Sequence, residues 1–484
     1  MSKLSNNDVD AIARSVLERL AHGSSEPHLS HAQHESVARS GSLPPGVFRS
    51  IDDCVRAARE AFVTFSQVGL DQRKAIIASI RASMREHGEE LARGAVEETG
   101  LGRVENKIIK NRLVTNKTPG PEELDPIAWS GDNGLTLVER APFGVIAAIT
   151  PTTNPTSTII CNSIGMLSAG NTVVFNVHPG AKRVSCRNVG LINDAVMRAG
   201  GPANTVTAMA EPTIESAQEL MTHKGIRVLV VTGGPGVVKA AMSSGKRAIC
   251  AGPGNPPVVV DETANIDNAG RDIVAGASFD NNVICTDEKE VFVVESVAER
   301  LLKVMGHSGA VVLTQPQARA LDKVIFNETR GPRKPGVINR KWIGKNASLI
   351  LEQIGMRVPD SVRLAVIDVS VDHPLIWTEQ LMPVLPVARV KSADEAIDMA
   401  IAAEHGFGHS AAMHSLHLGN LSRMAREINT SIFVKNGPIY NGLGEGGEGY
   451  TSFSIASPTG EGLTGPTTFS RIRRCVLKDH FRIV

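Results

Sequence analysis

The sequence predicts an α/β protein that contains two parallel sheets, each covered by helices. Three observations predict it: the chain is long, short β-branched runs recur along it, and amphipathic stretches separate those runs. Strands that alternate with helices favour parallel sheets with both faces covered. Because a single hydrophobic core stops growing at about 250–300 residues, a chain of 484 residues is expected to form two Rossmann-like parallel-sheet domains.

Composition and charge restrict the classes of partner. Lys and Arg total 51 against 50 Asp and Glu, so no net field draws the chain to nucleic acid or to an anionic membrane. No apolar run reaches the roughly 18 residues that a membrane-spanning helix needs. The six cysteines are far apart and show no zinc-ligand spacing. We therefore expect a small-molecule partner, no nucleic acid, no membrane and no metal.

The N-terminus carries a separate pattern. Within residues 1–21, apolar side chains recur at helical spacing from Val9 to Leu20, which predicts an amphipathic helix. Charged residues interrupt any apolar run there, so secretion is not expected. Residues 22–46 are rich in His, Ser, Gly and Pro and are expected to form a flexible linker. The linker histidines are interpreted as solvated side chains rather than metal ligands.

Helices and a series of strands are predicted for the remainder. Apolar side chains share one face of a helix that starts at Ser50, and a second helical pattern starts at Asp71 and ends at Gly100 and Gly102. Strands are predicted at 145–149, 172–177, 228–231, 258–260, 290–294, 311–313, 364–367 and 431–434. Two segments, 123–142 and 450–484, fit the alternation poorly. The last one is either a strand whose edge pairs with another subunit or an edge strand of its own subunit.

A glycine-rich turn follows one buried strand. The strand at 228–231 runs into Thr232, Gly233 and Gly234, and a helix is predicted directly after the turn. Backbone amides at such a helix start can bind a phosphate. Because the spacing departs from G-x-G-x-x-G, a purely structural strand–helix turn explains the pattern equally well.

An asparagine follows another buried strand. After Thr150 and Pro151, Pro155 biases Asn154 away from helical backbone and leaves its amide at the carboxyl end of the strand. An amide in that place can donate a hydrogen bond to a developing oxyanion. The alternative is an Asn that satisfies turn backbone, which is the commoner role in an Asn-Pro pair.

Cys285 lies between a polar loop and the apolar strand at 290–294. A thiol in that place can act as a nucleophile, and Asn281 and Asn282 are expected to make its approach polar. The alternative is an inert buried thiol, since free cysteine is among the most buried residue types. The amide, the glycine-rich turn and the lack of an evident base for activating water together favour covalent chemistry on a carbonyl.

Several long motifs occur in one order along the chain. They are Asn154 in I-T-P-x-x-N-P, Gly233 in V-T-G-G, the loop F-D-N-N-x-I-C that ends at Cys285, and T-E-Q-L-M-P with Glu379. Together they resemble the aldehyde dehydrogenase superfamily from about residue 44 onward. His178-Pro179 and the segments 251–264 and 433–438 resemble its CoA-acylating branch, in particular the acetaldehyde and propionaldehyde dehydrogenases of bacterial microcompartments. The resemblance implies an aldehyde dehydrogenase-like fold, with a small β oligomerisation arm beside the two sheet domains.

The resemblance also implies a role for each candidate site residue. Cys285 is the nucleophile, and Asn154 with the Cys285 backbone amide forms the oxyanion hole. Glu379 holds the nicotinamide ribose. The other cofactor contacts are Thr232, Gly233 and Gly234 at the pyrophosphate, together with Thr150, Pro151, His178 and Pro179. NAD is the implied electron acceptor and coenzyme A the co-substrate.

Two positions depart from the hydrolytic relatives. Cys250 stands where those enzymes carry the glutamate that activates water, which disfavours release of a free acid. Asn176 stands where they carry a lysine that assists the adenosine ribose, so the preference for NAD over NADP depends on the overall resemblance. The implied reaction is oxidation of a short aldehyde, acetaldehyde or propionaldehyde, to its acyl-CoA through a thiohemiacetal and a thioester on Cys285.

Domains, partners and location are implied in the same way. Residues 1–21 resemble the encapsulation peptides of microcompartment cargo, which predicts binding to shell or cargo proteins and a place in the microcompartment lumen. The expected domains are a dinucleotide-binding domain at 47–122 and 143–252, a catalytic domain at 253–449, and oligomerisation segments at 123–142 and 450–484. These segments are expected to give a homodimer or homotetramer.

Three alternatives remain open. A hydrolytic aldehyde dehydrogenase is disfavoured by Cys250. An acyl-phosphate reductase on the same fold would use phosphate in place of CoA. A catalytically silent microcompartment cargo protein would depend only on the helix at 9–20, and the intact Cys285, Asn154 and Glu379 disfavour it.

Overall fold

The computed structural model describes residues 43–484. The helix predicted within residues 1–21 and most of the linker predicted at 22–46 lie outside the described residues. Within 43–484, no helix is both long and apolar enough to cross a membrane.

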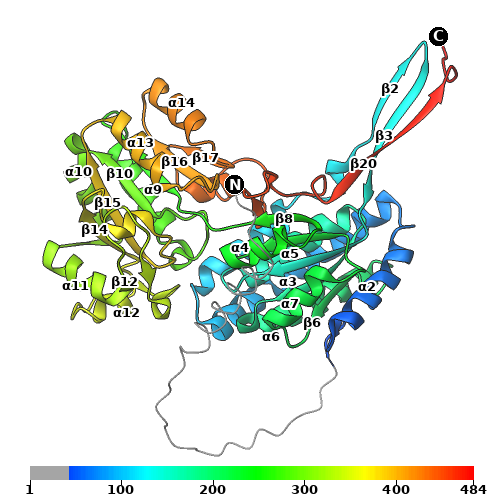
Figure 1. Cartoon of the computed structure of the whole chain (residues 1–484), viewed down its shortest axis with the longest axis horizontal. Helices are drawn as coiled ribbons and strands as arrows, with labels where there is room; N and C mark the ends of the chain where they lie inside the picture. Colours follow the sequence, from blue (N-terminus) through cyan, green and yellow to red (C-terminus); the bar gives the residue numbers. More distant parts are fainter. Residues whose placement is uncertain (1–42) are drawn as a thin grey trace, which may run out of the picture. The chain divides into compact units, whose positions relative to one another are not determined.

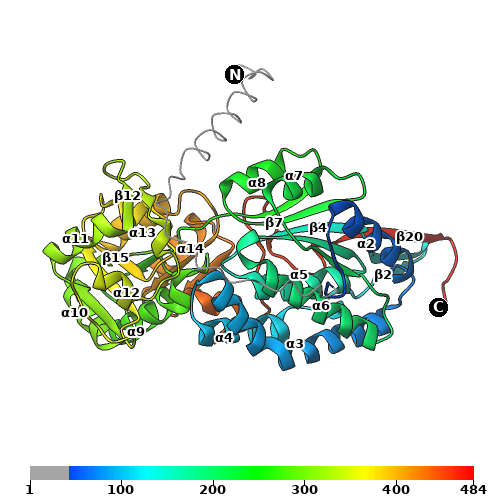
Figure 2. The same ribbon diagram turned by 90° about the horizontal axis from the view of Figure 1, so that it is seen from below.

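The first sheet has six strands, and every pairing in it is parallel. In spatial order they are β1 (Val47–Phe48), β6 (Val206–Met209), β5 (Thr172–Val177), β4 (Val145–Thr150), β7 (Val228–Thr232) and β8 (Arg247–Ala251). Its helices are α2 (Ile51–Phe65), α3 (Leu70–Thr99), α4 (Val104–Lys117), α5 (Pro155–Ser168), α6 (Lys182–Arg198), α7 (Ile214–Thr222) and α8 (Pro235–Met242). Figure 2 shows α7 and α8 on one side of this sheet and α3, α5 and α6 on the other.

Alternation along β4 explains the two covered faces. Ile146 and Ala148 pack into the core shared with α3, α5 and α6. Val145 and Ala147 pack into a separate core that contains side chains of α2, α7 and α8. Because successive side chains of a strand point to opposite faces, an uninterrupted apolar run is needed where both faces are buried.

The second sheet has seven strands, also paired in parallel throughout. In spatial order they are β11 (Ala310–Leu313), β14 (Leu364–Val369), β15 (Val384–Val390), β10 (Glu290–Val294), β9 (Pro257–Val260), β16 (Ser410–His414) and β17 (Ile432–Lys435). Its helices are α9 (Ile266–Ala277), α10 (Glu295–His307), α11 (Gln315–Ile325), α12 (Ala347–Glu352), α13 (Ala393–Ala403) and α14 (Leu418–Glu427), as Figure 1 shows. The prediction of an α/β fold with two parallel sheets is therefore confirmed.

A third, antiparallel sheet forms an arm from β2 (Ile127–Gly131), β3 (Gly134–Pro142) and β20 (Ser470–Lys478). β20 pairs with β3 of its own chain, from Ser470 opposite Pro142 to Lys478 opposite Gly134. The C-terminal strand is therefore an edge strand of its own subunit. Figure 1 shows the arm projecting from the side of the first sheet.

Short elements connect these sheets. The strands are β12 (Phe326–Glu328), β13 (Val337–Ile338), β18 (Ile455–Ala456) and β19 (Gly462–Leu463). The 3-10 helices are η1 (Pro121–Leu124), η2 (Pro179–Ala181), η3 (Phe279–Asn282), η4 (Arg340–Trp342), η5 (Pro374–Trp377) and η6 (Ile439–Leu443).

All eight strands predicted from the sequence are present, and both predicted helices start where expected. The Ser50 hydroxyl caps α2 by accepting the backbone N–H of Asp53, and Gly100 ends α3 with φ at 66°. Five strands of the two parallel sheets were not predicted: β1, β6, β8, β15 and β16. Two of the five residues in β8 and in β16 are alanines, which do not favour strands, so burial between neighbouring strands, rather than local preference, decides their conformation.

Candidate active site

A cavity of about 900 Å³ contains every site residue expected from the sequence. Its lining includes Thr150, Pro151, Asn154, His178, Pro179, Thr232, Gly233, Gly234, Cys285 and Glu379. The residues of the first sheet follow the carboxyl ends of the adjacent strands β5, β4 and β7, where open parallel sheets bind ligands. Cys285 and Glu379 instead precede β10 and β15, so the second sheet contributes its amino end.

The turn between β7 and α8 fits a diphosphate. Gly234 is the N-cap of α8, so free backbone amides of the first helical turn lie at the cavity wall. Thr150 also lines this cavity, and its buried hydroxyl has no hydrogen-bond partner among the described residues. An unsatisfied buried hydroxyl is what a bound polar ligand would complete.

Asn176 holds α7 in place beside the cavity. Its Oδ1 accepts from the Ser216 hydroxyl at 2.6 Å, and its Nδ2 donates to the Thr213 carbonyl at 3.4 Å. Ser216 and Thr213 also form the capping box at the start of α7. Both ends of the Asn176 amide are therefore engaged by protein groups, which distinguishes this position from a lysine that reaches toward a ribose.

The loop that carries Cys285 has an unusual backbone. Asp280, Asn281 and Asn282 have φ values of 45°, 55° and 64°, so three consecutive residues adopt left-handed conformations. Asp and Asn accept this region more readily than other non-glycine residues. The run ends three residues before Cys285 and turns the chain from α9 toward β10.

The two asparagines of this loop do not make the approach to the thiol polar, and that prediction is wrong. Both are fully buried and neither lines the cavity. Asn281 accepts from Arg103 Nε at 2.9 Å and donates to the Gly344 carbonyl at 2.9 Å. Asn282 donates to the Ala277 and Glu288 carbonyls. Their amides satisfy the carbonyls of Gly344, Ala277 and Glu288 and thereby hold the loop in place.

Cys285 is half-buried, and two groups of opposite charge shift the pKa of its thiol in opposite directions. Burial, and after it the Glu379 carboxylate, raise the pKa of the thiol, the Lys289 ammonium opposes both, and the result is a pKa of about 12. Lys289 is fully buried and donates to Asn282 Oδ1 at 2.6 Å and to the Ile284 carbonyl at 3.1 Å. Lys289 thus holds the loop through these hydrogen bonds, and its positive charge lowers the pKa of the Cys285 thiol.

The segment that follows Cys285 is charged but buried. Desolvation raises the pKa of Asp287 and of Glu290 well above their usual range, and raises that of Glu288 to about 8. Glu288 Oε1 accepts the backbone N–H of Ile439 at 2.8 Å, while Oε2 has no partner among the described residues. The sequence contains no signal for this burial, because a D-E-K-E run is typical of a solvated surface.

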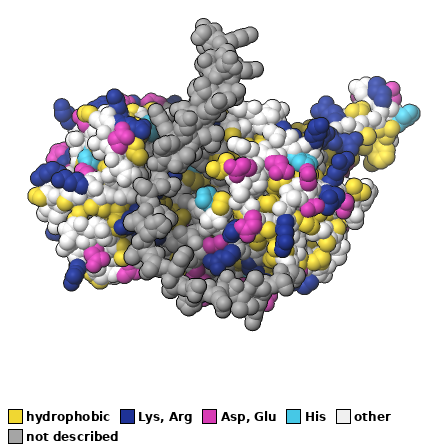
Figure 3. Space-filling view, turned by 60° about the horizontal axis from the view of Figure 1, so that its bottom comes forward, with side chains coloured by type: hydrophobic (Ala, Val, Ile, Leu, Met, Phe, Trp, Pro, Cys, Tyr) yellow, Lys and Arg dark blue, Asp and Glu magenta, His cyan; other side chains and the backbone are white. Residues whose placement is uncertain are grey.

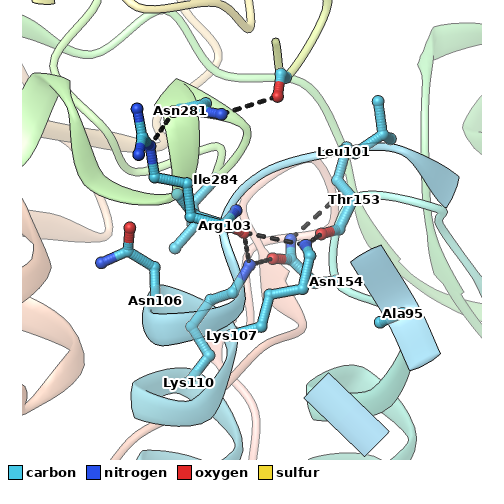
Figure 4. Close-up of polar contacts among 12 residues, drawn as sticks. Ala95, Leu101, Arg103, Asn106, Lys107, Lys110, Thr153, Asn154, Asn281 and Ile284 are labelled. Atoms are coloured by element: carbon cyan, nitrogen blue, oxygen red, sulfur yellow. Dashed lines mark hydrogen bonds and ion pairs between the residues drawn. The ribbon is translucent and has the colours of Figure 1, made fainter. Parts of the chain in front are cut away.

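A buried ion cluster, shown in Figure 4, lies behind Asn154. Asp280 pairs with the ammonium groups of Lys107, at 3.0 Å, and of Lys110. Lys110 Nζ also donates to Asn154 Oδ1 at 2.6 Å. Sequence reasoning missed both lysines, although their spacing on α4 matches the buried face that continues to Val114.

Asn154 lies at the start of helix α5, and its side-chain amide nitrogen can donate to a ligand. It is the N-cap of α5, and its φ of −133° and ψ of 53° are non-helical, as predicted. Pro155 occupies the first helical position, where proline is favoured. Its side chain is 7% exposed and lines the cavity. Among residues 43–484, the only hydrogen-bond partner of Nδ2 is the Thr153 hydroxyl, at the long distance of 3.3 Å. That nitrogen therefore retains the capacity to donate to a ligand oxygen.

Comparison with known proteins places this geometry in a family. The model of the aldehyde dehydrogenase family matches residues 40–454. The chain belongs to the aldehyde dehydrogenase family. The acetylating acetaldehyde dehydrogenase EutE of Salmonella typhimurium LT2 is 48% identical, over 99% of this chain and 100% of its own length.

Solved structures of other family members share the fold. The propionaldehyde dehydrogenase of the Clostridium phytofermentans fucose utilisation bacterial microcompartment has a TM-score of 0.88 and 47% identity, and the match covers 91% of this chain and 100% of that one. The Rhodopseudomonas palustris propionaldehyde dehydrogenase, solved with bound CoA and an acylated cysteine, has a TM-score of 0.87 and 48% identity. That match covers 90% of this chain and 98% of the other.

Within this aldehyde dehydrogenase, Cys250 cannot activate water. It is fully buried at the end of β8, and its backbone N–H donates to the Thr459 hydroxyl at 3.0 Å. Burial raises the pKa of the Cys250 thiol to about 11. Among the described residues that line the cavity, Glu379 is the only one with a carboxyl group.

Proposed function

We propose that this aldehyde dehydrogenase oxidises a short aliphatic aldehyde, acetaldehyde or propionaldehyde, to its acyl-CoA, with NAD as electron acceptor. The observation that carries the proposal is the shared cavity, in which Cys285, the free amide nitrogen of Asn154 and the β7–α8 turn meet. The acetylating and CoA-bound relatives confirm the narrower prediction of a CoA-acylating family member.

The proposed first step forms a bond between sulfur and the carbonyl carbon. The Cys285 thiol releases its proton to solvent, and the thiolate adds to the carbonyl carbon of the aldehyde and leaves an oxyanion. Asn154 Nδ2 and the Cys285 backbone amide donate hydrogen bonds to that oxyanion. When bound, a nicotinamide dinucleotide would accept the hydride that this adduct loses on becoming a thioester. The Cys285 side chain then carries the acyl group.

Acyl transfer completes the cycle. The CoA thiol adds to the thioester carbon, the bond to Cys285 breaks, and acyl-CoA leaves with the free enzyme thiol restored. One thioester is exchanged for another, so the step runs close to thermoneutral. Water competes poorly, because Cys250 occupies the place of the water-activating glutamate and no second carboxyl group among the described residues lines the cavity.

We assign the cofactor contacts as follows. Glu379 would hold the nicotinamide ribose, while Thr232, Gly233 and Gly234 would bind the pyrophosphate through backbone amides. Thr150, Pro151, His178 and Pro179 form the remaining wall. Support comes from their common position on one cavity and from the unsatisfied Thr150 hydroxyl.

NADH formation with and without CoA tests the proposal. With acetaldehyde or propionaldehyde, CoA should sustain turnover and acyl-CoA should accumulate in equal amount with NADH. Without CoA, we expect one burst of NADH stoichiometric with enzyme, and Cys285→Ala should abolish it. Steady turnover without CoA, with free acid as product, would indicate the hydrolytic alternative; turnover supported by phosphate would indicate an acyl-phosphate reductase.

We further propose that residues 1–21 bind a shell or cargo protein and place the enzyme in a microcompartment lumen. The support is the apolar helical pattern of this segment and the microcompartment origin of a relative. A chain lacking residues 1–21 should keep its activity and lose co-localisation with shell protein. If the truncated chain still co-localises, the targeting role is wrong.

We also propose that the arm pairs subunits into a homodimer or homotetramer, and that the remaining chain divides into the dinucleotide-binding and catalytic domains expected above. Trp129, Ile472 and Val476 of the arm are each more than half exposed, at 52%, 63% and 58%. Figure 3 shows hydrophobic side chains gathered on the arm. Exposed apolar groups in a sheet are typical of an interface. Val476→Asp should shift the mass measured by light scattering toward the monomer; an unchanged mass would contradict this role.

A further inference from the structure

We propose that Lys110 is a positioning residue for the oxyanion hole: its ammonium, held by Asp280, orients the Asn154 amide and polarises it toward the developing oxyanion. The inference deepens the proposed aldehyde oxidation and rests on it. Lys110 contacts Asn154, not the reacting atoms, so it acts through the asparagine.

The contact fixes which end of the amide is free. Lys110 Nζ lies 2.6 Å from Asn154 Oδ1. An ammonium can only donate, whereas an amide has an accepting oxygen and a donating nitrogen. A flipped amide would place two donors against each other, with both groups buried, so it is strongly disfavoured. Nδ2 is therefore held as the end available to a ligand in the cavity.

Charge adds to this geometric effect. Two lysines, Lys107 and Lys110, share the single carboxylate of Asp280, and all three side chains are buried. The cluster thus carries an excess positive charge directly behind the amide. Because Coulomb interactions strengthen away from water, this charge polarises the amide N–H and favours an oxyanion on its far side.

Asp280 offsets part of the cost of burying the Lys110 charge. Burial and Lys107 lower the pKa of Lys110, Asp280 and Asp287 raise it, and the result is a pKa of about 8. The ion pair with Asp280 and the hydrogen bond to Asn154 therefore keep the Lys110 side chain protonated at neutral pH.

Lys107 provides a matched control within the same cluster. It lies one turn earlier on α4, is equally buried, and pairs with the same Asp280 oxygen at 3.0 Å. Its second contact is the Thr153 carbonyl, at 3.1 Å, not the Asn154 side chain. Replacing either lysine removes one charge from the cluster, but only the replacement of Lys110 removes the contact with the Asn154 amide.

The test is a double-mutant cycle on full-length enzyme, read as the single-turnover rate of NADH formation without CoA. Lys110→Met should lower this rate about 10- to 100-fold, which is a smaller decrease than the removal of an oxyanion-hole donor causes. Asn154→Ala should lower it more. In the Asn154→Ala background, Lys110→Met should cost less than about threefold further, because coupled residues are not additive. NAD affinity and the aldehyde KM should stay near their wild-type values.

Two variants keep the test decisive. Lys110→Arg should recover part of the lost rate because it restores the charge and the donor. If Lys110→Met does not fold, Lys110→Gln, which keeps a donor without the charge, enters the same cycle. Rate losses that multiply in the double variant, or an equal loss in Lys107→Met, would overturn the positioning role.

Different results would contradict the proposed function and the proposed role of Lys110. A wild-type enzyme that gives no burst of NADH would contradict the proposed function itself. A wild-type burst combined with multiplying losses would contradict only the role of Lys110.

Discussion

Asp280 accepts the backbone N–H of Arg103 at 2.7 Å, which ties the loop before Cys285 to the start of α4. The two residues are 177 positions apart in the chain. The same carboxylate binds Lys107 and Lys110. One buried side chain therefore couples the shape of the nucleophile loop to the helix that supports Asn154.

Asp280→Asn should destabilise the protein by about 3 kcal/mol or more, because it leaves two buried ammonium groups without a counter-charge. Backbone strain is not the cause, since asparagine accepts the left-handed conformation at this position. Urea unfolding would measure the loss. Asp360→Asn is the control: Asp360 also pairs with Arg103, at 2.7 Å, but its side chain is 57% exposed. That change should cost less than about 1 kcal/mol; equal losses would contradict the importance of burial.

Gly102→Ala should disturb the same loop by direct contact. A Cβ at Gly102 would lie 2.0 Å from Asp280 Oδ1, and φ is +75°. Gly355 has φ at +78° with nothing within 4 Å of a Cβ. Both substitutions cost about 1 kcal/mol of stability through backbone strain. Any additional loss of stability in Gly102→Ala is therefore caused by the clash with Asp280. We expect Gly102→Ala to lower both the thermal midpoint and the NADH burst rate, and Gly355→Ala to lower only the midpoint, slightly. Similar behaviour of the two variants would refute the contact.

Alkylation of Cys285 should report its electrostatic surroundings. With the pKa of the thiol raised to about 12 in the ligand-free enzyme, the thiolate fraction increases about tenfold per pH unit between pH 7 and 9. The rate of carboxamidomethylation at Cys285, followed by mass spectrometry of its peptide, should rise accordingly.

Glu379→Gln should accelerate that alkylation at constant pH, because it removes the carboxylate that raises the thiol pKa. Lys289→Met should slow it for the opposite reason. The exposed Cys475 on the arm serves as an internal reference in every sample. A slower reaction in Glu379→Gln would contradict this electrostatic assignment.

The contribution of Glu288 to stability should fall as the pH rises from about 5 to 8. Burial raises the pKa of Glu288 from 4.5 to about 8, so over this range the folded state keeps a proton that the unfolded state has released. Rising pH therefore favours the unfolded state. Asp287 and Glu290 act with the same sign.

Glu288→Gln should reduce the difference between urea midpoints at pH 5.5 and 8, since glutamine is neutral in both states. The exposed Glu352→Gln is the control and should show the wild-type difference. If the Glu288 variant keeps the full pH dependence, the proton is held elsewhere.

The β-branched runs and the apolar helix faces predicted most of the architecture, because burial on both faces leaves a strong local pattern. Strand β16 escaped prediction since Ser410, Ala411 and Ala412 carry no strand preference and are shaped by their neighbours. The pairing of β20 with β3 was likewise open, because alternation indicates a strand but does not specify its partner.

The sequence by itself determined the α/β class, the family motifs, and ten of the residues that line the cavity, because each of these is visible as a local pattern of residue types. Only the tertiary structure decided that Lys110 and Asp280 meet behind Asn154, and that the charged run after Cys285 is buried. The physical reason is that a charge can be buried only where partners from distant segments compensate it. Such compensation depends on three-dimensional contacts that no local pattern encodes.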